Sequence, residues 1–213
     1  MKRYRFITLL MVIMFTFLMV IGCSKADEPS GNEKIAYISA KENSQYEKTF
    51  KDLNLGVLYD YHLKLPQADK SWVKIWVESY KNGEKMDPFH VEELSYGNNP
   101  APSVEGPMGF GIINTNAEKP LFFLYSSDAS IPPHEIENVL NQEGVRGSLW
   151  DYAIGKEEVA LESGETLVLG VYRQFKESFR PYDYQDNDQI TQMINEDMTV
   201  LLLKIRVELS SQP

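Results

Sequence analysis

The sequence contains a single cysteine, Cys23, among 213 residues. One cysteine cannot close a disulfide within the chain, and it cannot build the multi-cysteine clusters that hold structural zinc or iron. The fold must therefore be stabilised by packing. The 191 residues from Cys23 onward usually make one domain, which would bury roughly 70% of its unfolded surface without covalent staples.

Basic residues are also scarce, with 21 lysines and arginines against 31 aspartates and glutamates. Residues 1–22 contain three of the basic residues and none of the acidic ones, so the remaining chain has a formal charge of −13. Such an acidic surface repels phosphate backbones and anionic lipid headgroups. We therefore expect no nucleic-acid partner.

Long apolar runs are confined to the N-terminus. Three cationic residues within the first five positions precede an uncharged, almost wholly apolar run from Phe6 to Ile21. This order is typical of a secretory signal, and the run is slightly short for a membrane-spanning helix, which needs about 20 apolar residues. We expect residues 1–22 to be a signal peptide. An uncleaved anchor helix and an ordinary signal cut elsewhere are the alternatives.

The apolar run ends in Val20, Ile21, Gly22 and Cys23, which resembles the lipobox of bacterial prolipoproteins. The resemblance covers residues 1–23 only. It implies a diacylglyceryl group, typically palmitate-rich, on the Cys23 sulfur, and cleavage between Gly22 and Cys23. Two acyl chains give stable membrane attachment, since each buried methylene contributes roughly 0.8 kcal/mol. We therefore expect a lipid-anchored protein at the extracytoplasmic face of the cell membrane.

The segment after Cys23 is polar. Ser24 to Lys34 and Lys41 to Lys51 lack apolar periodicity and are rich in charged and turn-forming residues. We expect residues 23–49 to be a flexible tether, with an isolated extended piece at Ile35 to Ile38, and residues 50–213 to be the folded domain.

From Leu53 onward the dominant period is two, which predicts half-buried strands. Leu53 to Leu65 alternates between apolar and polar residues, and Trp72 to Tyr80 alternates before Asn82-Gly83, a type I′ turn signal that predicts a hairpin over residues 72–95. Further strands are expected at Met108–Asn114, Leu121–Tyr125, Ser148–Ile154, Glu157–Glu162, Thr166–Phe175 and Thr199–Leu209.

Two short helices complete the prediction. One starts at Pro132-Pro133 and ends before Gly144, which matches the proline-first, glycine-last pattern; the other runs from about Asp188 to Glu196. Many short strands without strand-helix alternation predict an all-β antiparallel sandwich, immunoglobulin-like in architecture but without a Cys-Trp-Cys framework.

Motifs for catalysis and cofactors are missing. There is no G-x-S-x-G elbow and no S-x-x-K with its partner motifs. His134-Glu135 begins like H-E-x-x-H, but Asn138 follows, and His62 and His90 fall on separate predicted strands, where a surface role is expected. A cluster of acidic residues, Asp183, Asp186 and Asp188, could bind calcium, but its spacing does not match an EF-hand loop. We favour the alternative that these residues form a solvated loop that caps the second helix. We expect neither enzyme activity nor a cofactor.

The most suggestive surface feature is an aromatic stripe of Trp72, Trp76 and Tyr80 on one face of a strand. Aromatic rings with interleaved polar groups are how carbohydrate-binding modules stack sugars; the alternative is that a loop or helix covers the rings. We therefore expect a non-enzymatic binding module whose partner is a protein or another component of the cell envelope. A module that binds cell-wall glycan through the stripe is the second hypothesis, and a carboxylate-based envelope hydrolase is the third.

Overall fold

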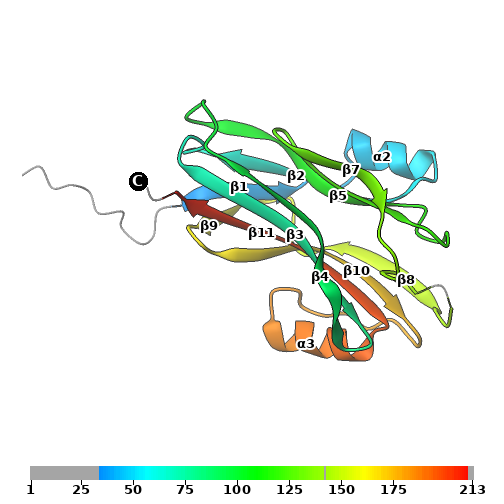
Figure 1. The fold of residues 1–213 in the computed structure, drawn as a ribbon. Coiled ribbons are helices and arrows are strands. Elements are labelled where there is room, and N and C mark those ends of the chain that lie inside the picture. Colours follow the sequence, from blue (N-terminus) through cyan, green and yellow to red (C-terminus); the bar gives the residue numbers. More distant parts are fainter. Residues whose placement is uncertain (1–33, 142, 211–213) are drawn as a thin grey trace, which may run out of the picture. The chain divides into compact units, whose positions relative to one another are not determined.

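The computed structural model describes residues 34–141 and 143–210, in which two antiparallel sheets pack face to face (Figure 1). The predicted all-β antiparallel sandwich is confirmed. The likeness to an immunoglobulin domain is limited to this two-sheet architecture. The sheets here have six and five strands, whereas those of a constant-type immunoglobulin domain have four and three. The chain from Lys34 onward forms one compact unit by itself.

The strands of each sheet follow one another in space as follows. The first sheet runs β7 (Ser130–Glu135), β6 (Leu121–Ser126), β5 (Val104–Ile113), β2 (Gly56–Leu65), β1 (Lys34–Ala40) and β9 (Val159–Glu162). The second sheet runs β4 (Glu84–Gly97), β3 (Ser71–Lys81), β11 (Thr199–Leu209), β10 (Thr166–Phe175) and β8 (Gly147–Tyr152). Helix α2 spans Gln45–Asp52 and helix α3 spans Asn187–Glu196.

Alternation along the strands separates the core from the two outer faces. In β11, Leu201, Leu203, Ile205 and Val207 are buried between the sheets, as predicted. On its other face Val200 and Leu202 pack in a second cluster with α3, and Arg206 is exposed beyond it. The predicted loss of cover half-way along this strand is therefore confirmed.

Two tyrosines of β2 tie the sheets together. The hydroxyls of Tyr59 and Tyr61 donate hydrogen bonds to the carbonyls of Val171 and Leu169 on β10, each at 2.6 Å. Gly170 makes room for both side chains, because a Cβ atom there would lie 2.8 Å from the Tyr59 ring and 2.8 Å from the Tyr61 hydroxyl oxygen. Burying a phenol costs little when its hydroxyl finds an acceptor, so these contacts fix the packing of the two sheets.

The expected tether over residues 23–49 is wrong from Lys34 onward; its first part, with Cys23 and the signal, lies outside the described residues. β1 is an inner strand between β2 and β9, and Ile35, Ala36 and Ile38 are at most 1% exposed. Both faces of this strand are buried, so it shows no alternation. Ser44 then caps α2 by accepting from the Glu47 amide.

The expected helix over residues 132–144 is also wrong. Pro132 and Pro133 lie in β7, an edge strand that pairs with β6. Proline is tolerated on an edge because its missing N–H leaves no bond unmade toward solvent. Val139 and Leu140 are buried from a loop instead of from a helix face.

Most other local predictions are confirmed, but the strand expected from Leu53 begins at Gly56, and Leu53 follows α2 and is 64% exposed. β3 and β4 form the expected hairpin, in which Asn82 and Gly83 have φ angles of 51° and 88°. Helix α3 is present, and Asp186 caps it by accepting from the amides of Asp188 and Gln189. No helix within the described ranges is long and apolar enough to cross a membrane.

Candidate functional site

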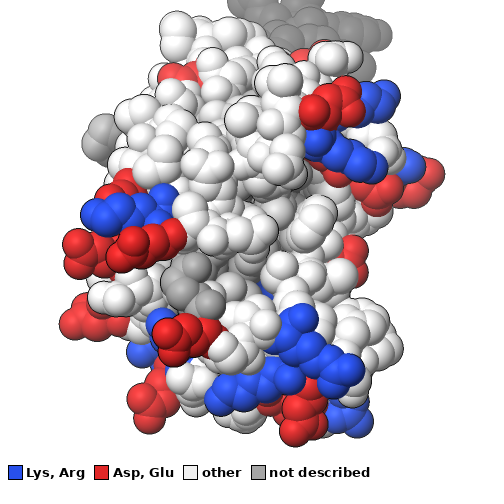
Figure 2. All heavy atoms as spheres, turned by 90° about the vertical axis from the view of Figure 1, so that its right-hand side faces the viewer, with Lys and Arg blue, Asp and Glu red and all other residues white. Residues whose placement is uncertain are grey.

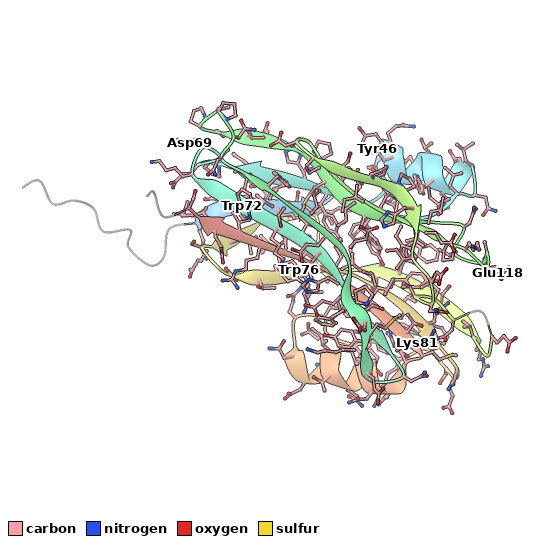
Figure 3. The ribbon with its side chains drawn as sticks, viewed as in Figure 1. Tyr46, Asp69, Trp72, Trp76, Lys81 and Glu118 are labelled. Carbon is pink, nitrogen blue, oxygen red and sulfur yellow. The ribbon has the colours of Figure 1, made fainter. Side chains whose placement is uncertain are left out.

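The predicted aromatic stripe lies on the outer face of the second sheet, but its three rings differ in exposure. Trp72 is 41% exposed and Trp76 is 7% exposed, while Tyr80 is half-buried in the cluster beneath α3. Figure 3 places Trp72 and Trp76 along β3. The three rings therefore lie on one face, but they do not form a surface of three exposed rings on which a ligand could stack.

Glu78 binds the polar groups of two of the rings, Trp76 and Tyr80. Its carboxylate accepts from Trp76 Nε1 at 2.9 Å, from the Tyr80 hydroxyl at 3.0 Å and from Lys204 Nζ at 2.7 Å. Burial opposes the charged form, but these three donors outweigh burial and hold the pKa of Glu78 below its usual value. The buried carboxylate thus fixes Trp76 and Tyr80 in the wall of the domain.

Trp72 is the exposed ring of the stripe. Its indole lies against the backbone of β4, because a Cβ atom at Gly97 would be 2.9 Å from Trp72 Cε3. Ion pairs flank it along the same face: Lys74 with Glu93 at 2.8 Å, and Arg206 with Glu208 at 2.6 Å. One exposed ring between ion pairs offers a single stacking position.

A second aromatic surface lies on the outer face of the first sheet, where glycines form its floor. Gly109 and Gly111 occupy outward positions of β5, opposite Tyr125 and Phe123 of β6. A Cβ atom at Gly111 would be 2.2 Å from the Phe123 ring, and one at Gly109 would be 2.7 Å from the Tyr125 ring. The two rings therefore lie across β5 and stack on each other with centroids 6.2 Å apart.

Helix α2 forms the opposite wall of this surface. Tyr46 meets Tyr125 edge to face at 6.2 Å, and Phe50 contacts Phe123 at 5.7 Å. Tyr46 is 54% exposed and stands at the rim, on α2 (Figure 3). The resulting depression, which we call the α2 groove, has a volume of about 360 Å³ and is lined by Tyr46, Thr49, Phe50, Leu58, Pro107, Phe123, Tyr125 and Ser126.

A buried polar group fixes one of the groove's rings. The Tyr125 hydroxyl donates to Asp60 Oδ1 at 2.8 Å, and the Asp60 amide donates to the Tyr152 hydroxyl at 3.0 Å. Burial, with the negative charge of Asp60 second, raises the pKa of Tyr125 well above its usual value. The phenol therefore stays protonated, and its hydrogen bond to Asp60 holds the ring in place. The groove is a preformed apolar surface.

A titratable pair lies elsewhere, between the edge strands β4 and β7. Glu92 is 4% exposed and points between the sheets, and its Oε1 is 3.5 Å from His134 Nδ1. Burial raises the pKa of Glu92 to about 7, although His134 acts in the opposite direction. Glu92 takes its inward position from the same alternation that turns Leu94 and Tyr96 inward, opposite the core strand β3. No local sequence pattern indicates the pair, because His134 comes from a strand about forty residues later in the chain.

The remaining polar candidates have local partners. His90 lies 2.7 Å from Glu93 and His62 lies 3.9 Å from Glu105, both partly exposed, as expected for surface positions. In the acidic loop, Asp183 accepts from the Gln185 amide, and Asp186 caps α3. Within the described ranges, no three histidine, cysteine, aspartate or glutamate side chains lie together so as to hold a metal ion.

A further hollow of about 550 Å³ lies beside the end of α3. Its floor is the buried ion pair of Arg173 and Asp197, with Nε and Oδ2 2.5 Å apart. The guanidinium also faces the Tyr182 ring at 4.6 Å and donates to the Arg180 carbonyl. Through these contacts Arg173 holds the loop after β10 against the end of α3. We therefore assign this hollow a structural role and not a binding role.

Comparison with known proteins adds no family. No protein-family model matches the chain, and searches of curated proteins and of solved structures find no match either. The site must therefore be argued from its geometry. Sequence reasoning missed the α2 groove because Tyr46 fell within the expected tether. The signals that could have found it were the Ser44-x-x-Glu47 capping pattern and the Gly-x-Gly at 109–111.

Proposed function

We propose that this chain is a non-enzymatic binding module of a bacterial cell envelope, anchored by lipid on Cys23 at the extracytoplasmic face of the membrane. The lipobox resemblance of Val20 to Cys23 supports the anchoring. The α2 groove is the observation that carries the binding role, because it is a preformed, largely apolar depression on the surface of a rigid sheet. Its ligand is an extended apolar segment of another envelope protein.

The lining of the groove supports a protein segment as ligand. Grooves walled by aromatic rings bind extended, proline-rich segments, whose flat pyrrolidine rings stack on the aromatic faces. Here Phe123 and Tyr125 supply the faces and Tyr46 the rim, with Thr49 and Ser126 as polar groups. The volume of about 360 Å³ falls within the range of roughly 300 to 1,000 Å³ that is usual for ligand sites.

One observation supports a glycan ligand instead, namely the exposed indole of Trp72 beside two ion pairs. Sugar recognition combines an aromatic face with hydrogen-bonding side chains. A chain of sugars needs successive faces, however, and Trp76 and Tyr80 are held by Glu78. The glycan hypothesis therefore rests on a single ring, and the groove is the better-supported site.

Nuclear magnetic resonance can separate the two ligands. Isotope-labelled protein from residue 24 onward is titrated with peptides that alternate proline and apolar residues, and separately with soluble wall-glycan fragments. We expect the peptides to shift the amide signals of Thr49, Tyr125 and Ser126. Shifts confined to the surroundings of Trp72, produced by glycan alone, would move the function to β3. No shift with either ligand would contradict both hypotheses.

A matched pair of variants on α2 tests the groove itself. Tyr46→Ala removes the 54% exposed ring at the rim, and Leu53→Ala removes a 64% exposed side chain just beyond the same helix that does not line the groove. We expect the first change to weaken peptide binding at least about tenfold, the cost of one aromatic contact, and the second to leave it unchanged. Equal effects would show that the peptide does not bind in the groove.

The anchoring is tested separately in cells. Cys23→Ala removes the sulfur that the lipobox resemblance marks for acylation. We expect this variant to take up no labelled fatty acid and to keep its signal segment, while a Ser24→Ala variant is processed normally. Normal maturation and membrane attachment of Cys23→Ala would contradict the lipid anchor without affecting the groove.

A further inference from the structure

Each sheet of the sandwich has two edge strands, and three of the four are protected against pairing with another chain. β7 contains Pro132 and Pro133. β4 contains Pro88, and its register shifts at two places. β9 has only four residues and ends at Glu162, which is ion-paired with Lys34. Proline, bulges, short length and charge are the usual devices that prevent edge-to-edge association.

β8 has fewer of these devices, and Asp151 is its one charged residue. It is the outer strand of the second sheet, and its sequence, Gly147-Ser-Leu-Trp-Asp-Tyr152, contains no proline and no lysine. Its pairing with β10 runs without a break from Gly147 to Tyr152. Ser148, Trp150 and Asp151 are exposed, and the Trp150 indole is 48% exposed although it is one of the largest apolar side chains. An edge without proline, lysine or a register shift that also exposes a tryptophan is typical of a strand that gains a partner.

The hydrogen-bond pattern shows which backbone groups of β8 are directed outward. The Ala153 amide donates to the Leu169 carbonyl, and Tyr152 pairs with Gly170 in the same register. In an antiparallel pair only every second residue bonds to a given neighbour. Residues 149, 151 and 153 therefore bond to β10, and Ser148, Trp150 and Tyr152 direct their N–H and C=O groups toward the open side.

The edge is complementary to itself. If two β8 strands pair antiparallel about a two-fold axis at Trp150, Trp150 lies opposite Trp150 of the partner subunit. Ser148 then faces Tyr152 of the partner subunit, and Leu149 faces Asp151 of the partner subunit. All outward-directed backbone groups find partners, and no like charges lie opposite each other. Figure 2 views the molecule from the right-hand side of Figure 1, where charged side chains gather toward the periphery.

We infer that β8 is a dimerisation edge, at which a second copy of this chain adds its own β8 and joins the two five-stranded sheets into one sheet of ten. The two-fold register centred on Trp150 defines the interface, and the tryptophan pair forms its centre. The α2 groove lies on the other sheet, so this inference is independent of the proposed ligand site.

Sedimentation equilibrium of the chain from residue 24 onward tests the inference, across concentrations from about 1 μM to about 500 μM. We expect a reversible monomer–dimer equilibrium. Trp150→Lys places two like charges at the centre of the interface, and we expect the dimer dissociation constant to rise more than about tenfold. Trp72→Lys replaces the other exposed tryptophan, on β3, and should leave the dissociation constant unchanged. A wild-type protein that is monomeric throughout, or a Trp150→Lys variant that dimerises as well as wild type, would overturn the inference.

A pair of proline substitutions tests the register. Ser148→Pro removes an outward-directed N–H, so the monomer should melt within a few degrees of wild type while the dimer is lost. Leu149→Pro removes an N–H that bonds to β10, so it should lower the melting temperature sharply. If Ser148→Pro folds but still dimerises, or if it destabilises the monomer as much as Leu149→Pro does, the assigned outward edge is wrong.

Discussion

Both outer faces of the sandwich carry one short amphipathic helix, and the two helices do different things. Helix α3 packs into a cluster that includes Met193, Val200 and Leu202, all fully buried. Helix α2 has no buried residue and touches its sheet through Tyr46 and Phe50. The outer face of the second sheet is therefore covered by α3 without a gap beneath the helix, which we call the closed face, whereas the outer face of the first sheet keeps the α2 groove.

The strands beneath the helices explain the difference. Under α3, the outward positions of β11 are aliphatic side chains that fill the space. Under α2, the outward positions of β5 are Gly109 and Gly111, so the rings of β6 lie flat and the helix stands on ring edges. A helix over aliphatic side chains becomes part of the core, whereas a helix over rings on a glycine floor becomes the wall of a groove.

The largest expected effect is at the closed face. Asp197 ends α3 and pairs with Arg173, and both side chains are almost completely buried. Asp197→Ala leaves the guanidinium buried without its partner, so we expect the free energy of unfolding to fall by about 3–5 kcal/mol. Urea denaturation at pH 7 measures the loss. A loss below about 1 kcal/mol would show that the pair is not needed to hold α3.

The next effect is the loss of a core contact from the same helix. Met193 is 0% exposed, so Met193→Ala should cost about 3 kcal/mol through lost burial and a residual cavity. Phe50→Ala, on the half-buried face of α2, should cost about half as much. If urea denaturation gives equal losses in the free energy of unfolding for the two variants, α2 contributes to the core as much as α3 does.

The closed face should also be the acid-sensitive one. The folded pKa of Glu78 lies below its usual value of 4.5, so its contribution is present above pH 4.5 and is lost as the pH falls through the folded pKa. Glu78→Gln removes charged hydrogen bonds, and we expect it to lower the free energy of unfolding by about 2 kcal/mol at pH 7. The difference from wild type should shrink below pH 4.5. A constant difference from pH 3 to pH 7 would contradict this role.

Sequence patterns were sufficient for the two longest apolar strands of the C-terminal half. β10 and β11 lie at their predicted bounds, Thr166–Phe175 and Thr199–Leu209, because runs of ten and eleven residues rich in β-branched and other apolar side chains leave little choice of element. β1 was expected only as an isolated extended piece at Ile35 to Ile38 within the tether, because seven residues buried on both faces show no alternation that would indicate a sheet strand. Pro132-Pro133 was misassigned because proline suits both the first turn of a helix and an edge strand, and only the sheet order separates the two.

The candidate site depends on contacts that no local pattern contains. The alternation of glycine along β5 was visible in the sequence, but the rings that cross it come from β6 and from a helix about sixty residues earlier in the chain. The aromatic stripe on β3 was placed on the correct face, and its burial depended on Glu78, Lys204 and α3. Periodicity places a side chain on a face, and the distant elements decide whether that face is open.

The smallest effect gives the sharpest comparison, because both helices begin at a side-chain cap. Ser44 accepts from Glu47 at the start of α2, and Asp186 accepts from Asp188 and Gln189 at the start of α3. Ser44→Ala and Asp186→Ala should each weaken their helix by about 1 kcal/mol. Since α2 buries no residue, the Ser44 change should speed amide exchange within residues 45–52 and leave global unfolding nearly unchanged. The Asp186 change should lower global stability, because α3 cannot open without exposing Met193. If both caps shift global unfolding equally, α2 is as much part of the core as α3.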